Sequence, residues 1–395
     1  MLIINFIILT VGLYLSFYVL YNLSLVLIHF LVPKRTVGRI TPVTVFKLLV
    51  PAHNEELLLG KLLRSIHVQD YPKDMYDVLV IADNCTDQTA KIAMHENVKT
   101  VERKDSRFVG KGFAINYGLE SVKNESYDAV LIIDADSIVD AGTLKELDRA
   151  IQEGARIMQC YNGLANPDDS WFTRLMDVSR TLGNEVLGSA KEKIGLSSHL
   201  MGNGMCFVRD VIESYGWNAF TVGEDWEYYA KVVMKGERIS FVKTARVYHK
   251  ESVDLKQATT QRLRWSSGRF AVAANHGIRL LYDGLKNSSL MRLDAAMPLL
   301  LPNPSLGISL TILMFVVALA VPLSDYRGFF LAWFGLLIVL QLAFFIVGVI
   351  YVKDRKKKMM AILFAPVFLI WKSGLDLLSV AGIGRKYWVR TERKL

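Results

Sequence analysis

Two stretches of the sequence, Val78-Leu79-Val80-Ile81-Ala82-Asp83 and Val130-Leu131-Ile132-Ile133-Asp134-Ala135-Asp136, decide the fold. Each is a short apolar run, rich in branched residues, that ends in carboxylates. This pattern is typical of a buried strand with a polar end. Ligands of open α/β sheets bind beyond the carboxyl ends of the strands. Asp83, Asp134 and Asp136 are therefore predicted to meet at one edge of a sheet.

The region from residue 43 to about 250 alternates such apolar runs with stretches of helical periodicity. Strands are expected at 43–50, 76–82, 98–102 and 129–133, and helices at 55–67, 87–96, 111–123 and 143–153. Strands that alternate with helices predict an α/β fold with a doubly wound, mostly parallel sheet and helices on both faces.

Three other stretches are apolar enough and long enough to cross a bilayer: 1–32, 302–322 and 328–352. A helix rises about 1.5 Å per residue, so about 20 residues span a hydrocarbon core of about 30 Å. The first stretch has neither the charged start nor the small-residue cleavage site of a signal peptide. An uncleaved anchor is therefore favoured over a cleaved signal.

Basic residues flank these stretches on one side. Lys34, Arg35 and Arg39 follow the first stretch. A second basic cluster follows the third stretch, at Lys353, Arg355, Lys356, Lys357 and Lys358. The positive-inside rule places both clusters in the cytoplasm, with the N-terminus outside and residues 34–300 inside. The sequence thus predicts a multi-pass protein of the plasma membrane with a cytoplasmic domain.

The last apolar stretch, 359–383, contains Pro366, Lys372 and Asp376 and is followed by a basic tail. Because both flanks are basic, a re-entrant or interfacial helix and a fourth span both remain open. The expected organisation is a transmembrane helix (1–33), a cytoplasmic domain (34–250), amphipathic interface helices (251–300), two transmembrane helices (301–353) and this last segment with its tail (359–395).

The net charge of +9 does not indicate nucleic-acid binding. Much of it lies beside the apolar stretches, where Lys and Arg meet anionic lipid headgroups, and no run interleaves basic and aromatic residues. Cys85, Cys160 and Cys206 are too widely spaced for a metal knuckle or a disulfide framework. Membrane lipids are therefore expected partners, and nucleic acids are not.

The paired carboxylates Asp134 and Asp136 suit Mg²⁺ or Mn²⁺, which favour carboxylate, water and phosphate oxygens. A solvated turn is the alternative reading. Asp83 either reaches a ligand or belongs to a capping turn. Lys111, between Gly110 and Gly112, offers a cation for phosphate where the backbone can approach closely, although the spacing is not that of a Walker loop.

Glu224 and Asp225, in Gly-Glu-Asp-Trp-Glu, are the candidates for a general base, although acids at this position also favour a helix start. Gln261, Arg264 and Trp265 share one helical face. Arg264 could neutralise a leaving diphosphate and Trp265 could stack on a sugar ring. A membrane-interface helix is the alternative for this segment, because Arg and Trp are both common there.

Together these residues resemble the membrane-integrated family 2 glycosyltransferases, which include cellulose, hyaluronan, chitin and poly-N-acetylglucosamine synthases. The resemblance covers residues 45–270, with a looser echo at 388–393. It implies that the nucleotide sugar is bound by His53, Glu55, Asp83, Lys111, Asp134, Asp136, Gln261, Arg264 and Trp265. It further implies a catalytic role for Asp225 with Glu224, a metal site at Asp136 and Asp134, and acceptor contacts at Trp265, Gly202 and Asn203.

Two segments, 82–87 and 166–171, look closest to a bacterial exopolysaccharide branch of that family. The resemblance implies a GT-A fold, a UDP-sugar donor, Mg²⁺ or Mn²⁺, and inversion to a β-linkage. The favoured function is a processive synthase that uses UDP-glucose to make an exported β-glucan, such as a β-1,4 or mixed β-1,3/1,4 polymer. An export partner or a homo-oligomer would be compatible with that function.

The sequence leaves two alternatives to the processive synthase. The same residues would serve the transfer of one sugar to a membrane lipid, which the short membrane part favours. A non-catalytic membrane subunit of the same fold would have no need for Asp83, Asp134, Asp136, Asp225 and Arg264 together. Product size distinguishes the first two functions, and any turnover excludes the third.

Overall fold

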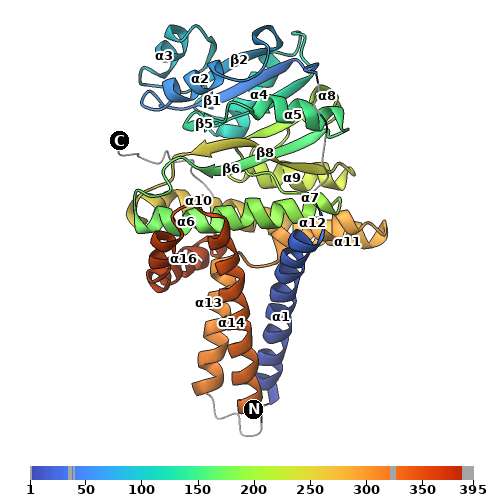
Figure 1. The fold of residues 1–395 in the computed structure, drawn as a ribbon, viewed down its shortest axis with the longest axis vertical. Helices are drawn as coiled ribbons and strands as arrows, with labels where there is room; N and C mark the ends of the chain where they lie inside the picture. The colour runs from blue at the N-terminus through green and yellow to red at the C-terminus, as the bar shows by residue number, and fades with distance from the viewer. Residues whose placement is uncertain (1, 34–37, 39–40, 321–325, 385–395) are drawn as a thin grey trace.

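The computed structural model describes residues 2–33, 38, 41–320 and 326–384. Figure 1 shows an α/β domain, a layer of helices beneath it, and a bundle that projects away from that layer. The basic residues Lys34, Arg35 and Arg39 lie outside the described residues, as do the tail 385–395 and the echo at 388–393. The structure therefore says nothing of those expectations.

The domain is built on an 8-stranded sheet of order β3-β2-β1-β4-β7-β6-β8-β5. The strands are β1 (Phe46–Ala52), β2 (Tyr76–Asp83), β3 (Lys99–Arg103), β4 (Ala129–Ile132), β5 (Ser137–Val139), β6 (Ile157–Leu164), β7 (Met205–Val208) and β8 (Ile239–His249). The pairings show that β5 and β7 run against the other strands. The predicted α/β fold with a mostly parallel sheet is confirmed.

Alternate residues of the central strands point to opposite faces of the sheet, and both faces are covered. Leu49 and Ile81 pack with α4 (Lys111–Ser121), while Leu48 and Val80 pack with α2 (Leu59–His67). All four side chains are fully buried. A two-sided core of this kind explains why the strands read as continuous apolar runs rather than alternating ones.

The four expected strands and four expected helices are all present, and the largest differences lie at the starts of two of them. The first strand begins at Phe46 rather than at residue 43, and α2 begins at Leu59 rather than at residue 55. The chain turns before α2 with Asn54 at φ 56°, a conformation that favours Asn. The other helices of the domain are α3 (Thr89–His95), α5 (Thr143–Gln152), α6 (Trp171–Thr181), α7 (Ser189–Lys193), α8 (Arg209–Tyr215) and α9 (Glu224–Met234).

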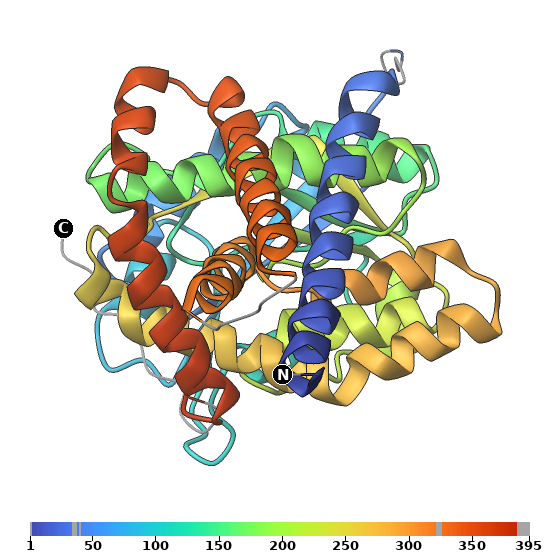
Figure 2. The same cartoon turned by 90° about the horizontal axis from the view of Figure 1, so that it is seen from below.

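The projecting bundle consists of α1 (Leu2–Leu31), α13 (Pro304–Ala320) and α14 (Arg327–Tyr351), which Figure 2 shows from below. Within the described residues, α1 and α14 are long and apolar enough to cross a membrane. The number rises to four only if each of two bent helix pairs counts as one span. These helices indicate membrane association, whereas the predicted three spans and their orientation stay a proposal.

The two bent pairs lie where the bundle meets the domain. The pair α12 (Leu290–Leu300) and α13 bends by 66°, and the pair α15 (Arg355–Ile362) and α16 (Ala365–Val380) bends by 61°. Figure 1 shows α16 next to α6 and α10 (Leu255–Val272), not along the length of α13 and α14. This placement favours the interfacial reading of the last apolar stretch.

Within the expected interface segment (251–300), the helix that begins with α10 changes its winding partway along its length. A π-helical turn (Ala273–Gly277) separates α10 from α11 (Ile278–Lys286). Extra residues of this kind rotate the helix faces relative to one another, and π-bulges are frequent at functional sites. The π-helical turn therefore changes the direction in which the side chains of α11 point relative to those of α10.

Gly204 offers a direct test of the packing between the two halves of the sheet. Its φ is +68°, and an added Cβ would lie 2.8 Å from both Cys160 Cβ and Val247 Cγ2. We expect Gly204→Ala to lower stability by about 2–4 kcal/mol, because steric overlap adds to backbone strain. Gly154→Ala is the control: its φ is +94° with nothing within 4 Å, so only about 1 kcal/mol of strain is expected. Equal melting temperatures for the two variants would contradict this account.

Candidate active site

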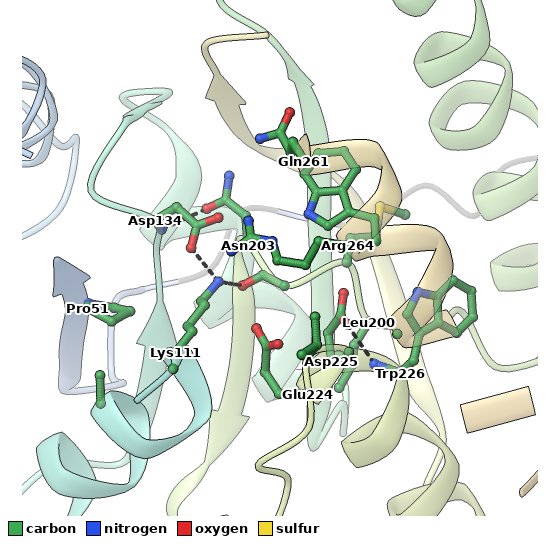
Figure 3. Close-up of a pocket in the computed structure, with 18 of the residues that line it drawn as sticks. Pro51, Lys111, Asp134, Leu200, Asn203, Glu224, Asp225, Trp226, Gln261 and Arg264 are labelled. Atoms are coloured by element: carbon green, nitrogen blue, oxygen red, sulfur yellow. Dashed lines mark hydrogen bonds and ion pairs between the residues drawn. The ribbon is translucent and has the colours of Figure 1, made fainter. Parts of the chain in front are cut away.

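A cavity of about 680 Å³ opens at the carboxyl ends of β1, β2 and β4 (Figure 3). Every site residue predicted from the sequence lines it: His53, Glu55, Asp83, Lys111, Asp134, Asp136, Gly202, Asn203, Glu224, Asp225, Gln261, Arg264 and Trp265. These residues come from segments that are more than 200 residues apart in the chain. The sheet edge and α10 bring them together, while their individual roles stay predictions.

Asp83 ends β2 at one side of the cavity and is only 5% exposed. Arg103 Nη1 donates to Asp83 Oδ1 at 2.7 Å, and a second guanidinium nitrogen donates to the Phe108 carbonyl at 2.8 Å. Burial raises the pKa of Asp83, although the neighbouring guanidinium opposes the rise. His53 Nδ1 lies 2.7 Å from the Asp83 carbonyl oxygen. The carboxylate is thus fixed in position by the next strand.

Lys111 begins α4 and reaches the centre of the cavity. Its ammonium donates to Asp134 Oδ1 and, at 2.6 Å, to the Gly202 carbonyl. Burial disfavours the charge on Lys111, but the carboxylates of Asp134, Glu224 and Asp225 outweigh it and raise the pKa. A permanently charged ammonium therefore joins β4 to the turn before β7.

The turn at Gly202 and Asn203 is held by amide hydrogen bonds from buried side chains. Asn203 Oδ1 accepts from the Asp134 backbone N–H at 3.0 Å, and Asn203 Nδ2 donates to Ser137 Oγ at 3.0 Å. Gly202 has φ +79° and lies against Asp225, whose Oδ2 would be 3.4 Å from an added Cβ. The turn thus fixes Asp134 and leaves little space above Asp225.

Glu224 and Asp225 start α9, and both face the cavity (Figure 3). Asp225 Oδ1 accepts from the Trp226 N–H at 2.8 Å. Burial raises the pKa of both carboxyls; repulsion from Asp225 adds to the rise at Glu224, and the Lys111 ammonium opposes it at both. Elevated carboxyl pKa values in a cleft are typical of groups that exchange protons.

Contacts between glycines set the distance from α10 to these acids. An added Cβ at Gly268 would lie 2.8 Å from the Gly223 nitrogen, and one at Gly223 would lie 3.0 Å from the Gly268 carbonyl carbon. On the other side, a Cβ at Gly112 would lie 2.2 Å from the Ala219 oxygen. Close backbone approach of this kind requires glycine. It holds α4, the loop before α9 and α10 in direct contact.

The α10 face that lines the cavity carries Gln261, Arg264 and Trp265, as the helical spacing predicts. The Trp265 ring lies between two guanidinium groups, with Arg262 at 4.8 Å and Arg180 at 5.7 Å from its centroid. Gln261 is 6% exposed, and its Oε1 has no hydrogen-bond partner among the residues that the structure describes. Figure 3 shows Arg264 approaching from the side opposite Lys111. Two cations therefore face each other above the two acids.

The donor set fits Mg²⁺ or Mn²⁺ only with help from a ligand. Among the described residues there is no group of three or more His, Cys, Asp and Glu side chains that could hold a metal ion. Asp134 and Asp136 supply two carboxylates at the cavity wall. Such ions are commonly bound by one or two carboxylates, with substrate phosphates and water completing the shell. The chemistry of this wall therefore fits a metal–diphosphate ligand.

Several residues at the cavity were not singled out in the sequence. Arg103 pairs in register with Asp83 on the neighbouring strand, so a strand alignment would have found it. His199 and His249 line the cavity together with Arg180. His199 stacks on Trp226 with an interplanar angle of 7°, and burial lowers its pKa to about 3. No local pattern in the sequence marks these residues.

A carboxylate-lined cavity at the strand ends of a mostly parallel sheet, faced by Lys111 and Arg264, is typical of the GT-A fold of glycosyltransferases. Residues 42–268 match the family described as "Glycosyltransferase like family 2", and the chain belongs to that family. A membrane-integrated synthase is a narrower assignment, which this family membership does not make.

The chain is similar to a probable glycosyltransferase, YdaM, of Bacillus subtilis (strain 168), with 24% identity over 229 residues, 56% of this chain and 54% of the relative. It is also similar to the beta-monoglucosyldiacylglycerol synthase of Nostoc sp. (strain PCC 7120), with 26% identity over 232 residues, 56% and 48% of the two chains. The chain thus spans about half the length of these curated relatives.

A similar solved structure is the mannosyltransferase PcManGT from Pyrobaculum calidifontis in complex with GDP-Man and Mn²⁺. Its TM-score is 0.51 at 18% identity, over 85% of this chain and 98% of that one. At this level of identity the likeness supports the fold alone.

The raised pKa of Asp225 has a consequence for stability that does not depend on activity. A carboxyl whose pKa is higher in the folded than in the unfolded state loses stability as pH rises through its folded pKa. We expect Asp225→Asn to raise the melting temperature at pH 8 by roughly 2–4 °C, since each kcal/mol shifts a domain of this size by about that much. The gain should shrink toward pH 5, where the wild-type carboxyl takes up its proton. A lower melting temperature for Asp225→Asn at pH 8 would contradict this assignment.

Proposed function

We propose that this protein transfers a sugar from a UDP-sugar to an acceptor hydroxyl with inversion, at the cytoplasmic face of the plasma membrane. The observation that carries the proposal is the position of Asp225: a half-buried carboxyl with a raised pKa, between the Lys111 ammonium and the Gln261–Trp265 face of α10. A single carboxyl between a phosphate-binding side and an acceptor side is what inverting transfer requires.

In the proposed reaction the acceptor hydroxyl oxygen attacks the anomeric carbon of the donor and its proton passes to Asp225. The bond from that carbon to the UDP oxygen breaks, and the diphosphate leaves with the bonding electrons. Lys111 and Arg264 approach the cavity from opposite sides and stabilise the charge that develops on the leaving group. Glu224 stands beside Asp225 at the start of α9 and lines the same cavity.

Donor binding is assigned to the side of the cavity formed by β1, β2 and β4. His53, Glu55 and Asp83 would contact the nucleoside, because they lie at the ends of β1 and β2. Asp134 and Asp136 would hold Mg²⁺ or Mn²⁺, which neutralises diphosphate charge when bound. Trp265, Gly202 and Asn203 would contact the acceptor near Asp225.

The first candidate acceptor is a growing polysaccharide, so that the enzyme is a processive synthase of an exported β-glucan from UDP-glucose. The segments 82–87 and 166–171, which resemble an exopolysaccharide branch, favour it. The second candidate is a membrane lipid that receives one sugar. The similarity to beta-monoglucosyldiacylglycerol synthases and the few membrane helices favour it.

Product size decides between the two acceptors. Detergent-purified protein is incubated with Mg²⁺ and radiolabelled UDP-glucose, with UDP-N-acetylglucosamine in parallel. We expect material that stays at the chromatographic origin and is cut by a β-glucanase if the enzyme is a processive glucan synthase. A small, organic-extractable product would instead assign a lipid acceptor. Absence of labelled product with both donors would contradict the proposed UDP-sugar transfer.

Asp225→Asn tests the proposed base directly. The amide keeps the shape of the side chain and its hydrogen bond to the Trp226 N–H but cannot accept the acceptor proton. We expect kcat to fall about 10²–10⁴-fold, the usual contribution of a general base. UDP affinity, measured by calorimetry, should stay near the wild-type value. Loss of UDP binding would move Asp225 from the acceptor side to the donor side.

Asp136→Ala tests the proposed metal site. Asp134 and Asp136 supply two carboxylates, so phosphate oxygens are needed to complete the coordination shell of the metal. Metal and UDP are therefore expected to bind interdependently. Chelation by EDTA should weaken UDP binding to the wild-type protein, and Asp136→Ala should remove most of that metal dependence. Titration of UDP with and without Mn²⁺ measures it. Unchanged metal dependence in the variant would exclude Asp136 as a ligand.

A further inference from the structure

The face of α10 that points away from the cavity is bound along its length by α16 and the turn that follows it. Residues 259, 263 and 266 are spaced by three or four positions, so they share this face, while Ser267 lies at its edge and also lines the cavity. The contacts are Trp371 Nε1 to Thr259 Oγ1 at 3.1 Å, Ser379 Oγ to the Leu263 carbonyl at 3.4 Å, and Ser267 Oγ to the Ile383 carbonyl at 2.5 Å. The middle turns of α10 thus form hydrogen bonds with the last apolar segment.

An ion pair lies at the centre of these contacts. Lys372 and Asp376 of α16 pair with each other and are 7% and 1% exposed. Ser266 of α10 bridges them, since its Oγ lies 3.0 Å from Lys372 Nζ and donates to Asp376 Oδ1 at 2.9 Å. These are the two charged residues that interrupted the last apolar stretch of the sequence. Ser266, which binds both of them, is next to Trp265 in the sequence.

The same carboxylate also reaches the other bent pair. Asn303, at the break between α12 and α13, donates to Asp376 Oδ2 at 3.3 Å. Arg269 of α10 donates to the carbonyls of Pro298 and Leu301 beside that break, at 2.7 and 2.5 Å. Both bends of the membrane part are therefore connected to one helix, the one that lines the cavity.

The opposite face of α10 carries Gln261, Arg264, Trp265 and Gly268, which line the cavity. A small rotation or slide of α10 would move all four side chains at once, because a helix moves as a rigid rod over a few turns. On the cavity side the position of α10 is limited by glycine contacts with the loop before α9. On the membrane side, the contacts with α16 fix the position of α10.

We propose that α16 is a brace for the active site and that Lys372, Asp376 and Ser266 form its latch, positioning Gln261, Arg264 and Trp265 for transfer. Apolar packing alone would hold the two helices together but would tolerate sliding. A buried ion pair that shares a hydroxyl with the neighbouring helix allows one register, as buried polar groups do in coiled coils. The latch residues act through α10 and touch no substrate, so they are positioning residues.

The test removes the latch without leaving a buried charge unpaired. Lys372→Met with Asp376→Leu replaces the pair by apolar side chains, a change that is often neutral for stability. We expect the melting temperature to be retained and kcat to fall about tenfold, since small misplacements of positioning groups are costly. UDP affinity should fall by a smaller factor than kcat, because His53, Glu55, Asp83 and the Asp134–Asp136 pair lie at the strand ends and not on α10. Ser266→Ala should lower kcat in the same direction by a smaller factor.

A matched control removes a second buried pair from the same bent segment. Lys358 of α15 is 1% exposed, and its Nζ lies 2.8 Å from Asp177 Oδ2 of α6 and 3.1 Å from Asp168 Oδ1. The side chain of Asp168 is 41% exposed, so it stays solvated when Lys358 is replaced, and none of the three residues belongs to α10. Lys358→Met with Asp177→Leu should keep kcat near the wild-type value. An equal loss of kcat in both double variants would overturn the proposal, since it would show a general loss of membrane packing. An unchanged kcat in the latch variant would overturn it as well.

This inference rests on the proposed transfer reaction, so a second readout is independent of activity. Amide hydrogen exchange over 255–272 should be about tenfold faster in the latch variant than in the wild type and the control, because α10 loses its membrane-side contacts. Faster exchange in a protein that transfers no sugar would support the brace and refute the proposed function. Unchanged exchange would overturn the brace itself.

Discussion

The rest of the site depends on the buried ammonium of Lys111. It joins three parts of the fold: Asp134 at the end of β4, the Gly202 carbonyl in the turn before β7, and its own helix α4. It also faces Glu224 and Asp225, so its charge is shared by three carboxylates, those of Asp134, Glu224 and Asp225. Like charges at such distances repel strongly in a medium of low dielectric constant. Lys111 therefore makes it possible to gather the acids that the chemistry needs.

The cavity around Lys111 has a donor side and an acceptor side, and different parts of the structure hold each of them in place. The donor side is built on parallel strands that are buried on both faces, so its residues are fixed by the core. The acceptor side is carried by α10, which no strand supports. Glycine contacts to the loop before α9 and the polar contacts to α16 hold it instead. The acceptor side is thus attached to the membrane part, where both proposed acceptors would be found.

Much of the donor side could be predicted from local sequence, because each residue there follows an apolar run whose end fixes its position. Asp83, Asp134 and Asp136 are of this kind. Arg103 was missed because its importance comes from pairing in register with Asp83, which is a relation between strands. Arg180 and His249 were missed for a similar reason: they reach the cavity from α6 and β8, which lie in the half of the sheet whose strands were not predicted.

The sequence by itself determined the fold class, the order of the first strands and helices, and the set of residue types at the site, because periodicity and strand ends are local properties. It also marked Lys372 and Asp376 as out of place in an apolar stretch. Only the tertiary structure decided that Ser266 joins this pair, that α16 bends away from the bundle, and that α10 faces Asp225. The contacts of Ser266 with Lys372 and Asp376 join residues about a hundred positions apart. The energy of such contacts depends on packing that no single segment encodes.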